Sequence, residues 1–226
     1  MQPPPQDLES LLSGRHLAQR GFSFPAGSWR AWTGHLEDNS ALFDELPTEL
    51  DRRTTARTVE RLLPDDATAA FTVAMVWGHG SSGYGPYRTA KVLTAAPSPK
   101  DAPVAPWVRD RLQESVEVAR ERGAIEGYRF LNNRPGKVTG LGPAFFTKWL
   151  YFVTARGDST SALAAPVLDA LVIAWLASHA GFALRAGYTD DYARYVETLT
   201  SWGAPHGLAA SEVEERIFRL IRNDGV

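Results

Sequence analysis

The sequence predicts an all-α protein, a single multi-helix domain of about ten helices over residues 6–226. Three observations support this fold class. The 226 residues are 44% hydrophobic and 22% charged, which is enough for a substantial buried core. Several segments with apolar residues at helical spacing begin at a proline or an acidic residue and end at a glycine. No segment shows the strict alternation of apolar and polar residues that is typical of a half-buried strand.

The N-terminal half contains one strong helix signal and two segments that are unlike a helix. Residues 1–5 include three prolines and are expected to be a disordered start. Asp65 and Asp66 precede the apolar, alanine-rich run that includes residues 71–77, which favours a buried helix there over a buried strand. Residues 95–106 contain four prolines and are a candidate seam between subdomains, because prolines at this spacing prevent a helix.

Five further helices are predicted in the C-terminal half from the residues at their boundaries. Proline at the first helical position and glycine after the last are the usual signals, and a serine followed three residues later by a glutamate forms a capping box. The predicted helices run from Pro106 to Gly123, from Pro143 towards Gly157, over residues 167–178 between Pro166 and Gly181, from a cap at Thr189 or Asp190 through Leu199, and from the capping box of Ser211 and Glu214 onwards.

The composition excludes several classes of site and of protein. The chain has no cysteine, which excludes disulfides, thiolate zinc sites and iron-sulfur clusters. Its longest apolar stretches, residues 69–77 and 170–177, are far shorter than the roughly 20 residues of a membrane span. We therefore expect a cytoplasmic protein with no membrane partner and no evident protein partner. Its histidines have no metal-ligand spacing, so no metal site is expected and they are interpreted as structural or surface residues: His16, His35, His79, His179 and His206.

Charge is distributed unevenly, although the net charge is only -2. Residues 37–66 carry nine acidic residues and four arginines. Residues 127–156 carry five basic residues and no acidic one: Arg129, Arg134, Lys137, Lys148 and Arg156. This basic segment is the candidate contact for a polyanion in an otherwise acidic protein.

The segment Val138–Pro143 lies inside the basic stretch, between two predicted helices. Gly140 and Gly142 permit a tight turn and leave the amides at the start of the next helix free to bind a phosphate. Such a turn binds a nucleic-acid backbone without reading its sequence. A plain connection between two helices explains the same glycine spacing equally well.

Lys148 and Asp169 are the candidate reactive pair. Lys148 falls on an apolar and aromatic stretch, where desolvation lowers the pKa of an amine and makes it a nucleophile. Asp169 lies in an apolar run near the start of the next helix, where a partly buried carboxylate needs a cationic partner. The alternative readings are a lysine whose head reaches solvent and an aspartate that complements the helix dipole.

The run from Gly140 to Lys148, GLGPAFFTK, followed by Asp169 within PVLD, resembles the helix-hairpin-helix DNA glycosylases, and among them the 8-oxoguanine DNA glycosylases. The resemblance covers about residues 124–178 and implies an all-α glycosylase-like domain with its hairpin at about 124–155. In bifunctional members the lysine lies nearer the second hairpin glycine, whereas Lys148 lies one turn further along on the same helix face.

The resemblance implies excision of an oxidised purine such as 8-oxoguanine from double-stranded DNA, with Lys148 as nucleophile, Asp169 as its assistant and strand cleavage as a further activity. It implies no cofactor beyond a monovalent cation at the hairpin. The implied DNA-binding residues are Arg134, Lys137, Thr139, Gly140 and Gly142. Flat side chains are expected around the extruded base, and the candidates are Phe152, Tyr84 and Tyr87.

Two alternatives remain open at this point. The same fold and hairpin are compatible with a DNA-binding protein that has no glycosylase activity, and the net acidic charge favours it. The sequence from Gly78 to Gly83 also matches the dinucleotide fingerprint G-x-G-x-x-G. Tyr84-Gly85-Pro86 then interrupts the long helix that this fingerprint requires, so a loop that contacts DNA is the preferred interpretation.

Overall fold

A computed structural model describes residues 3–14, 19–36, 39, 41–63 and 65–222. Met1 and Gln2, part of the expected disordered start, lie outside the described residues, as does His16. In chain order the described residues form α1 (Gln6–Leu12), β1 (Phe22–Ser23), α2 (Ala26–Thr33), α3 (Leu42–Glu45), β2 (Glu49–Leu50), α4 (Arg52–Leu62), α5 (Ala67–His79), α6 (Gly85–Thr94), α7 (Pro106–Arg122), α8 (Ala124–Asn132), α9 (Pro143–Ala155), α10 (Ala170–His179), α11 (Thr189–Gly203), the 3-10 helix η1 (Ala204–His206) and α12 (Ala210–Arg222).

The predicted all-α class is confirmed. Within the described residues the only sheet is the antiparallel pair of two-residue strands, in which Phe22 faces Leu50 and Ser23 faces Glu49. None of the helices in this part of the chain is long and apolar enough to cross a membrane.

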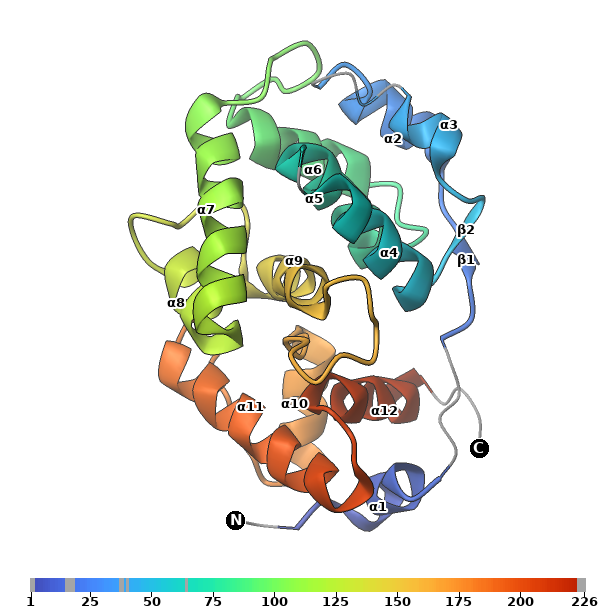
Figure 1. Ribbon diagram of the computed structural model, residues 1–226, viewed down its shortest axis with the longest axis vertical. Helices are drawn as coiled ribbons and strands as arrows, with labels where there is room; N and C mark the ends of the chain where they lie inside the picture. The colour runs from blue at the N-terminus through green and yellow to red at the C-terminus, as the bar shows by residue number, and fades with distance from the viewer. Residues whose placement is uncertain (1–2, 15–18, 37–38, 40, 64, 223–226) are drawn as a thin grey trace.

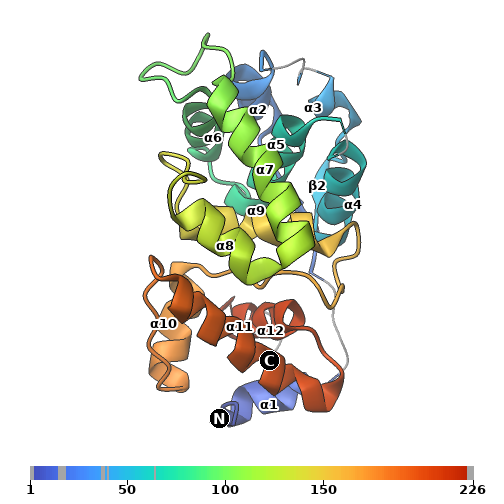
Figure 2. The same ribbon diagram turned by 60° about the vertical axis from the view of Figure 1, so that its left-hand side comes forward.

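The helices form two groups that lie one above the other (Figures 1 and 2). Helices α2 to α9 make the larger group, and α1 joins α10, α11 and α12 in the smaller one. The segment 156–169 leads from α9 in the first group to α10 in the second. In the sequence, the chain therefore passes from the larger group to the smaller one directly after α9.

The proline-rich segment 95–106 is not the seam that its composition suggested. It connects α6 to α7, and these two helices contact each other within the larger group. The prolines prevent a helix at this point, as expected, but the chain on both sides returns to the same core.

Helix α5 is the central helix of the larger group and contacts α4, α6, α7 and α9. The Asp66 carboxylate accepts hydrogen bonds from the amides of Thr68 (2.9 Å) and Ala69 (2.8 Å), so an N-cap begins the helix. Every residue from Ala67 to Trp77 is buried. The apolar run is helical, as predicted, because its cap satisfies two amides that a buried segment cannot leave unpaired.

The starts of α10 and α11 differ from the predicted ones. Helix α10 begins at Ala170 rather than after Pro166, with Asp169 as its N-cap. Tyr188, rather than Thr189 or Asp190, occupies the N-cap position of α11.

The last helix does not begin with the predicted capping box. Helix α12 begins at Ala210, and the Glu212 carboxylate accepts the Ala209 amide at 2.9 Å. Ser211 is buried inside the helix, and Glu214 points inward to an arginine of α4. The prediction was wrong because Glu214, which local spacing assigned to the helix start, forms a buried ion pair instead.

Candidate functional site

A helical hairpin presents the basic segment. Helices α8 and α9 flank a loop of residues 133–142. In this loop Gly140 has φ +84°, which favours glycine, and the Leu141 amide donates to the Val138 carbonyl at 3.2 Å. Val138 and Leu141 are buried and anchor the turn, whereas Thr139 is exposed.

The exposed face of this loop carries the predicted DNA contacts. Arg134, Lys137, Thr139 and Gly140 are exposed, and Gly142 is half-buried at the N-cap of α9. In the first turn of α9 Pro143 has no amide hydrogen and the Phe145 amide donates to the Gly142 carbonyl at 2.9 Å, so among the described residues the Ala144 amide is the one left without an acceptor. The loop thus combines two positive side chains with the positive end of a helix dipole.

Lys148 lies on the second turn of α9 and is half-buried. Its Nζ donates a hydrogen bond to the Gly78 carbonyl of α5 at 2.9 Å and lies 4.9 Å from the centre of the Phe145 ring. Burial lowers the pKa of Lys148, and Arg52 lowers it further, whereas Asp169 and Glu214 raise it. Because desolvation is the largest of these effects, a reactive neutral amine is more accessible here than on a surface lysine.

The end of α5 surrounds the lysine with groups that sequence reasoning did not assign to the site. Gly78 packs so closely on the lysine stem that an added Cβ would lie 3.0 Å from Lys148 Cδ. The His79 ring stacks on Phe145 at 4.3 Å with an interplanar angle of 26°. Burial, together with the positive charges of Lys148 and Arg88, lowers the pKa of His79 to about 4, so this ring is neutral at neutral pH.

A small cavity of about 10 Å³ connects this cluster to the hairpin turn, since both His79 and Gly140 line it. The Arg88 guanidinium, which also lines it, lies 5.6 Å from the Phe145 ring centre. Lys148 does not line this cavity and adjoins it through its contact with the Phe145 ring.

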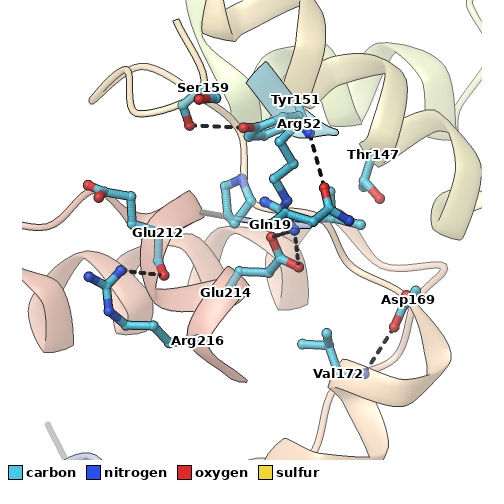
Figure 3. A network of polar contacts seen from close by, with 12 residues as sticks. Gln19, Arg52, Thr147, Tyr151, Ser159, Asp169, Val172, Glu212, Glu214 and Arg216 are labelled. Carbon is cyan, nitrogen blue, oxygen red and sulfur yellow. Dashed lines mark hydrogen bonds and ion pairs between the residues drawn. The ribbon is translucent and has the colours of Figure 1, made fainter. Parts of the chain in front are cut away.

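Asp169 is presented by the start of α10, in the smaller helix group. Its Oδ1 accepts the amides of Leu171 and Val172, each at 3.0 Å, and Figure 3 shows the side chain at the head of its helix. Among the described residues no hydrogen bond to its other oxygen, Oδ2, is found. Thr147, next to Lys148 on α9, accepts the Leu168 amide at 3.1 Å and thereby holds the approach to Asp169 against α9.

Lys148 and Asp169 thus come from different helix groups and lie within electrostatic range of each other. The helix dipole of α10 stabilises the carboxylate as an anion. The Lys148 amine of α9 and the Asp169 carboxylate at the start of α10 therefore interact electrostatically across the boundary between the two helix groups.

The three predicted pocket rings differ in position. Phe152 is fully buried, 5.1 Å from Trp77 and 4.9 Å from Tyr151. A ring without an accessible face cannot stack on a base in this conformation, so Phe152 is corrected from a pocket ring to a residue of the core. Tyr84 is 60% exposed and lies 5.5 Å from Tyr87.

The dinucleotide fingerprint has no matching structure. Gly78 lies inside α5, and Gly80 ends that helix with φ +58°. The fingerprint needs a strand before its first glycine, whereas this segment is a helix followed by a turn into α6. Within the described residues, no group of histidine, aspartate and glutamate side chains could hold a metal ion.

A buried ion pair near the lysine was also missed by sequence reasoning. Arg52 on α4 donates from Nη2 to both carboxylate oxygens of Glu214 on α12, at 3.0 and 2.9 Å (Figure 3). Burial raises the pKa of Glu214 to about 7, although Arg52 opposes that shift. No sequence pattern marks the pair, because its members lie 162 positions apart.

Comparison with known proteins identifies the family of the chain. The family model described as "putative 8-oxoguanine DNA glycosylase OGG-like protein" matches residues 15–218. No curated protein and no solved structure matches the chain. The matched range includes the hairpin, the end of α5 and both members of the reactive pair.

Proposed function

The chain belongs to this OGG-like family, and from that premise we propose that it removes an oxidised purine, such as 8-oxoguanine, from double-stranded DNA with Lys148 as the nucleophile. A DNA glycosylase-like role follows from the family. The observation that carries the finer proposal is the half-buried Lys148 amine, held at 2.9 Å from the Gly78 carbonyl and within electrostatic range of Asp169.

Binding begins at the hairpin in this proposal. Lys137 and Arg134 neutralise phosphates, and Thr139, Gly140 and Gly142 contact the backbone through the turn and the Ala144 amide at the start of α9. These contacts fix the position of the duplex without reading its sequence. The damaged nucleotide then leaves the stack, as a base must before an enzyme can act on it, with Phe145, Tyr84 and Tyr87 as the nearby rings.

The chemical step is a substitution at the sugar. The lone pair of Lys148 Nζ forms a bond to C1′ while the bond from C1′ to the base nitrogen breaks, and the base leaves with that electron pair and takes up a proton. Asp169 stabilises the positive charge that develops on the sugar. The bond from C1′ to the ring oxygen then opens. Of the two protons that the amine gives up, one has gone to the base and the other goes to the ring oxygen, which becomes a hydroxyl, and an imine forms between Lys148 and C1′.

Strand cleavage follows from the same imine. Removal of a C2′ proton moves electrons towards the imine and expels the 3′ phosphate with its bonding pair. Beyond the imine, the lyase step therefore needs a base that accepts the C2′ proton.

Borohydride trapping tests the proposal directly, because hydride reduces the imine to a stable amine. The protein is mixed with duplexes that contain 8-oxoguanine, uracil or an abasic site. We expect an adduct with the oxidised purine, its loss in Lys148→Ala and a strong reduction in Asp169→Asn. The control is Lys100→Ala, which removes an exposed lysine of the loop between α6 and α7 and should trap as the wild type does.

The second candidate function is a helix-hairpin-helix protein that binds DNA without excision. The net charge of -2 and the position of Lys148 one turn beyond its usual place favour it. Binding of all three duplexes without any adduct would support this candidate and contradict catalysis by Lys148. Binding should weaken with salt in either case, since the contacts are to phosphates.

A further inference from the structure

The buried ion pair between Arg52 and Glu214 joins the two helix groups. The side chains of Arg52 and Glu214 are 7% and 2% exposed, and the pair connects the first residue of α4 to the middle of α12. Arg52 Nη1 has no hydrogen-bond partner among the described residues. The desolvation free energy of two buried charges offsets much of their mutual attraction. A contribution to stability alone therefore explains the pair poorly.

The guanidinium lies over two rings that adjoin the lysine. Arg52 Cζ is 5.2 Å from the Trp77 ring centre and 5.0 Å from that of Tyr151. Trp77 directly precedes Gly78, whose carbonyl accepts the lysine hydrogen bond, and Tyr151 follows Lys148 by three positions on α9. The ion pair is therefore in contact with the neighbours of both ends of the hydrogen bond between Lys148 and Gly78.

Further hydrogen bonds hold this arrangement in place. Gln19 Oε1 accepts both the Arg52 amide and Trp77 Nε1, each at 3.0 Å. The Tyr151 hydroxyl donates to the Ser159 carbonyl at 2.9 Å (Figure 3). The rings cannot turn away from the guanidinium without breaking these bonds.

The titratable groups that face the lysine come from five helices. His79 of α5, Arg88 of α6, Asp169 at the head of α10, Arg52 of α4 and Glu214 of α12 all act on this region. Glu215, Tyr151 and Asp169 act in turn on Arg52 or Glu214. Of these groups only Arg52 and Glu214 form a bidentate pair with each other, so loss of one charge leaves the other uncompensated near the amine.

We infer that Arg52 and Glu214 are positioning residues of the proposed lysine site: the pair holds Trp77 and Tyr151 beside Lys148 and balances the charge around its amine. The inference rests on the proposed function, because it assigns the pair to the reactive lysine. The pair acts through Lys148 and contacts neither the sugar nor the base.

A lysine-selective titration tests the inference without DNA. The chain has only four lysines, so protein labelled with ¹³C at lysine Cε gives few signals, and Lys148→Arg assigns the signal of Lys148. In Glu214→Gln the Arg52 charge is uncompensated, and we expect the pKa of Lys148 to fall by about one unit. Glu212→Gln, on the same helix but outside the charges that act on the lysine, is the matched control and should leave the titration unchanged.

The wild-type protein offers a second measurement that does not depend on a variant that folds. When the Glu214 carboxylate takes up its proton near pH 7, the Lys148 signal should show an inflection at the same pH. A Lys148 titration in Glu214→Gln that equals the control overturns the inference. If Glu214→Gln does not fold, the absence of the wild-type inflection overturns it.

Trapping experiments separate this inference from the proposed function. If wild-type protein traps, the acid limb of the trapping rate should move down by about one pH unit in Glu214→Gln, which a purely structural loss would not produce. If no lesion traps but the Lys148 pKa still responds to Glu214, the proposed function fails and the electrostatic link between the pair and the lysine stands.

Discussion

Replacement of Gly78 by alanine should lower the rate of imine formation without loss of stability. Gly78 lies in α5, one residue before its end, and an added Cβ would lie 3.0 Å from Lys148 Cδ and 3.8 Å from Phe145 Cδ1. The first distance is several tenths of an ångström shorter than an ordinary contact, so the flexible lysine stem must move. The alanine itself favours the helix by up to about 1 kcal/mol.

The size of the effect follows from that displacement. A misplacement of about 1 Å at a catalytic group costs on the order of 100-fold in rate, so a shift of several tenths predicts a loss of roughly fivefold. Single-turnover trapping measures the rate, and urea unfolding measures the free energy of unfolding. Stability should be unchanged or higher by up to about 1 kcal/mol.

Gly83→Ala is the matched control for this variant. Gly83 belongs to the same glycine-rich segment, and no atom lies within 4 Å of a Cβ built there. It should therefore trap at the wild-type rate. If Gly78→Ala, Gly83→Ala and the wild type trap at equal rates, the contact with Gly78 does not determine the position of the Lys148 side chain, and the reasoning is refuted.

Two further predictions concern stability. Gly127→Ala on α8 places a Cβ 2.9 Å from both Ala119 Cβ of α7 and Leu150 Cδ2 of α9, so α8 must move away from these two helices; we expect a loss of about 1–3 kcal/mol in urea unfolding, and an unchanged midpoint would contradict this packing. The pKa of His79 is lowered to about 4 from an ordinary 6.5, so the unfolded chain binds the proton first as the pH falls and stability is lost between about pH 6.5 and 4. His79→Gln should flatten that loss in unfolding measured across this range, and an unaltered pH dependence would show that the ring is not buried as described.

Much of the fold was predictable because its helix ends are marked by local chemistry. Asp66 begins α5 with its carboxylate, and Pro143 and Gly123 mark helix boundaries where the sequence placed them. The sequence pattern of one family includes the residue types found from Gly140 to Lys148 and at Asp169, so this part of the candidate site was recognisable. The family match confirms the resemblance.

The rest of the site depends on contacts between distant segments, which spacing does not encode. The Gly78 carbonyl lies 70 positions from Lys148, and Arg52 lies 162 from Glu214. Phe152 was misassigned for a related reason. Helix α9 contacts α4, α5, α7 and α8, so it is enclosed on most sides. The position of Phe152 along the helix therefore does not reveal whether its ring is buried or exposed.

The central claim, that Lys148 is the nucleophile, is tested most directly by mass spectrometry of the trapped adduct. Wild-type protein is reduced with borohydride on a duplex that contains 8-oxoguanine, digested, and its cross-linked peptide identified. The mechanism predicts that the sugar is attached to Lys148 and to none of the other three lysines. Attachment to Lys91, Lys100, Lys137 or the terminal amine, or base release without any adduct, would contradict it.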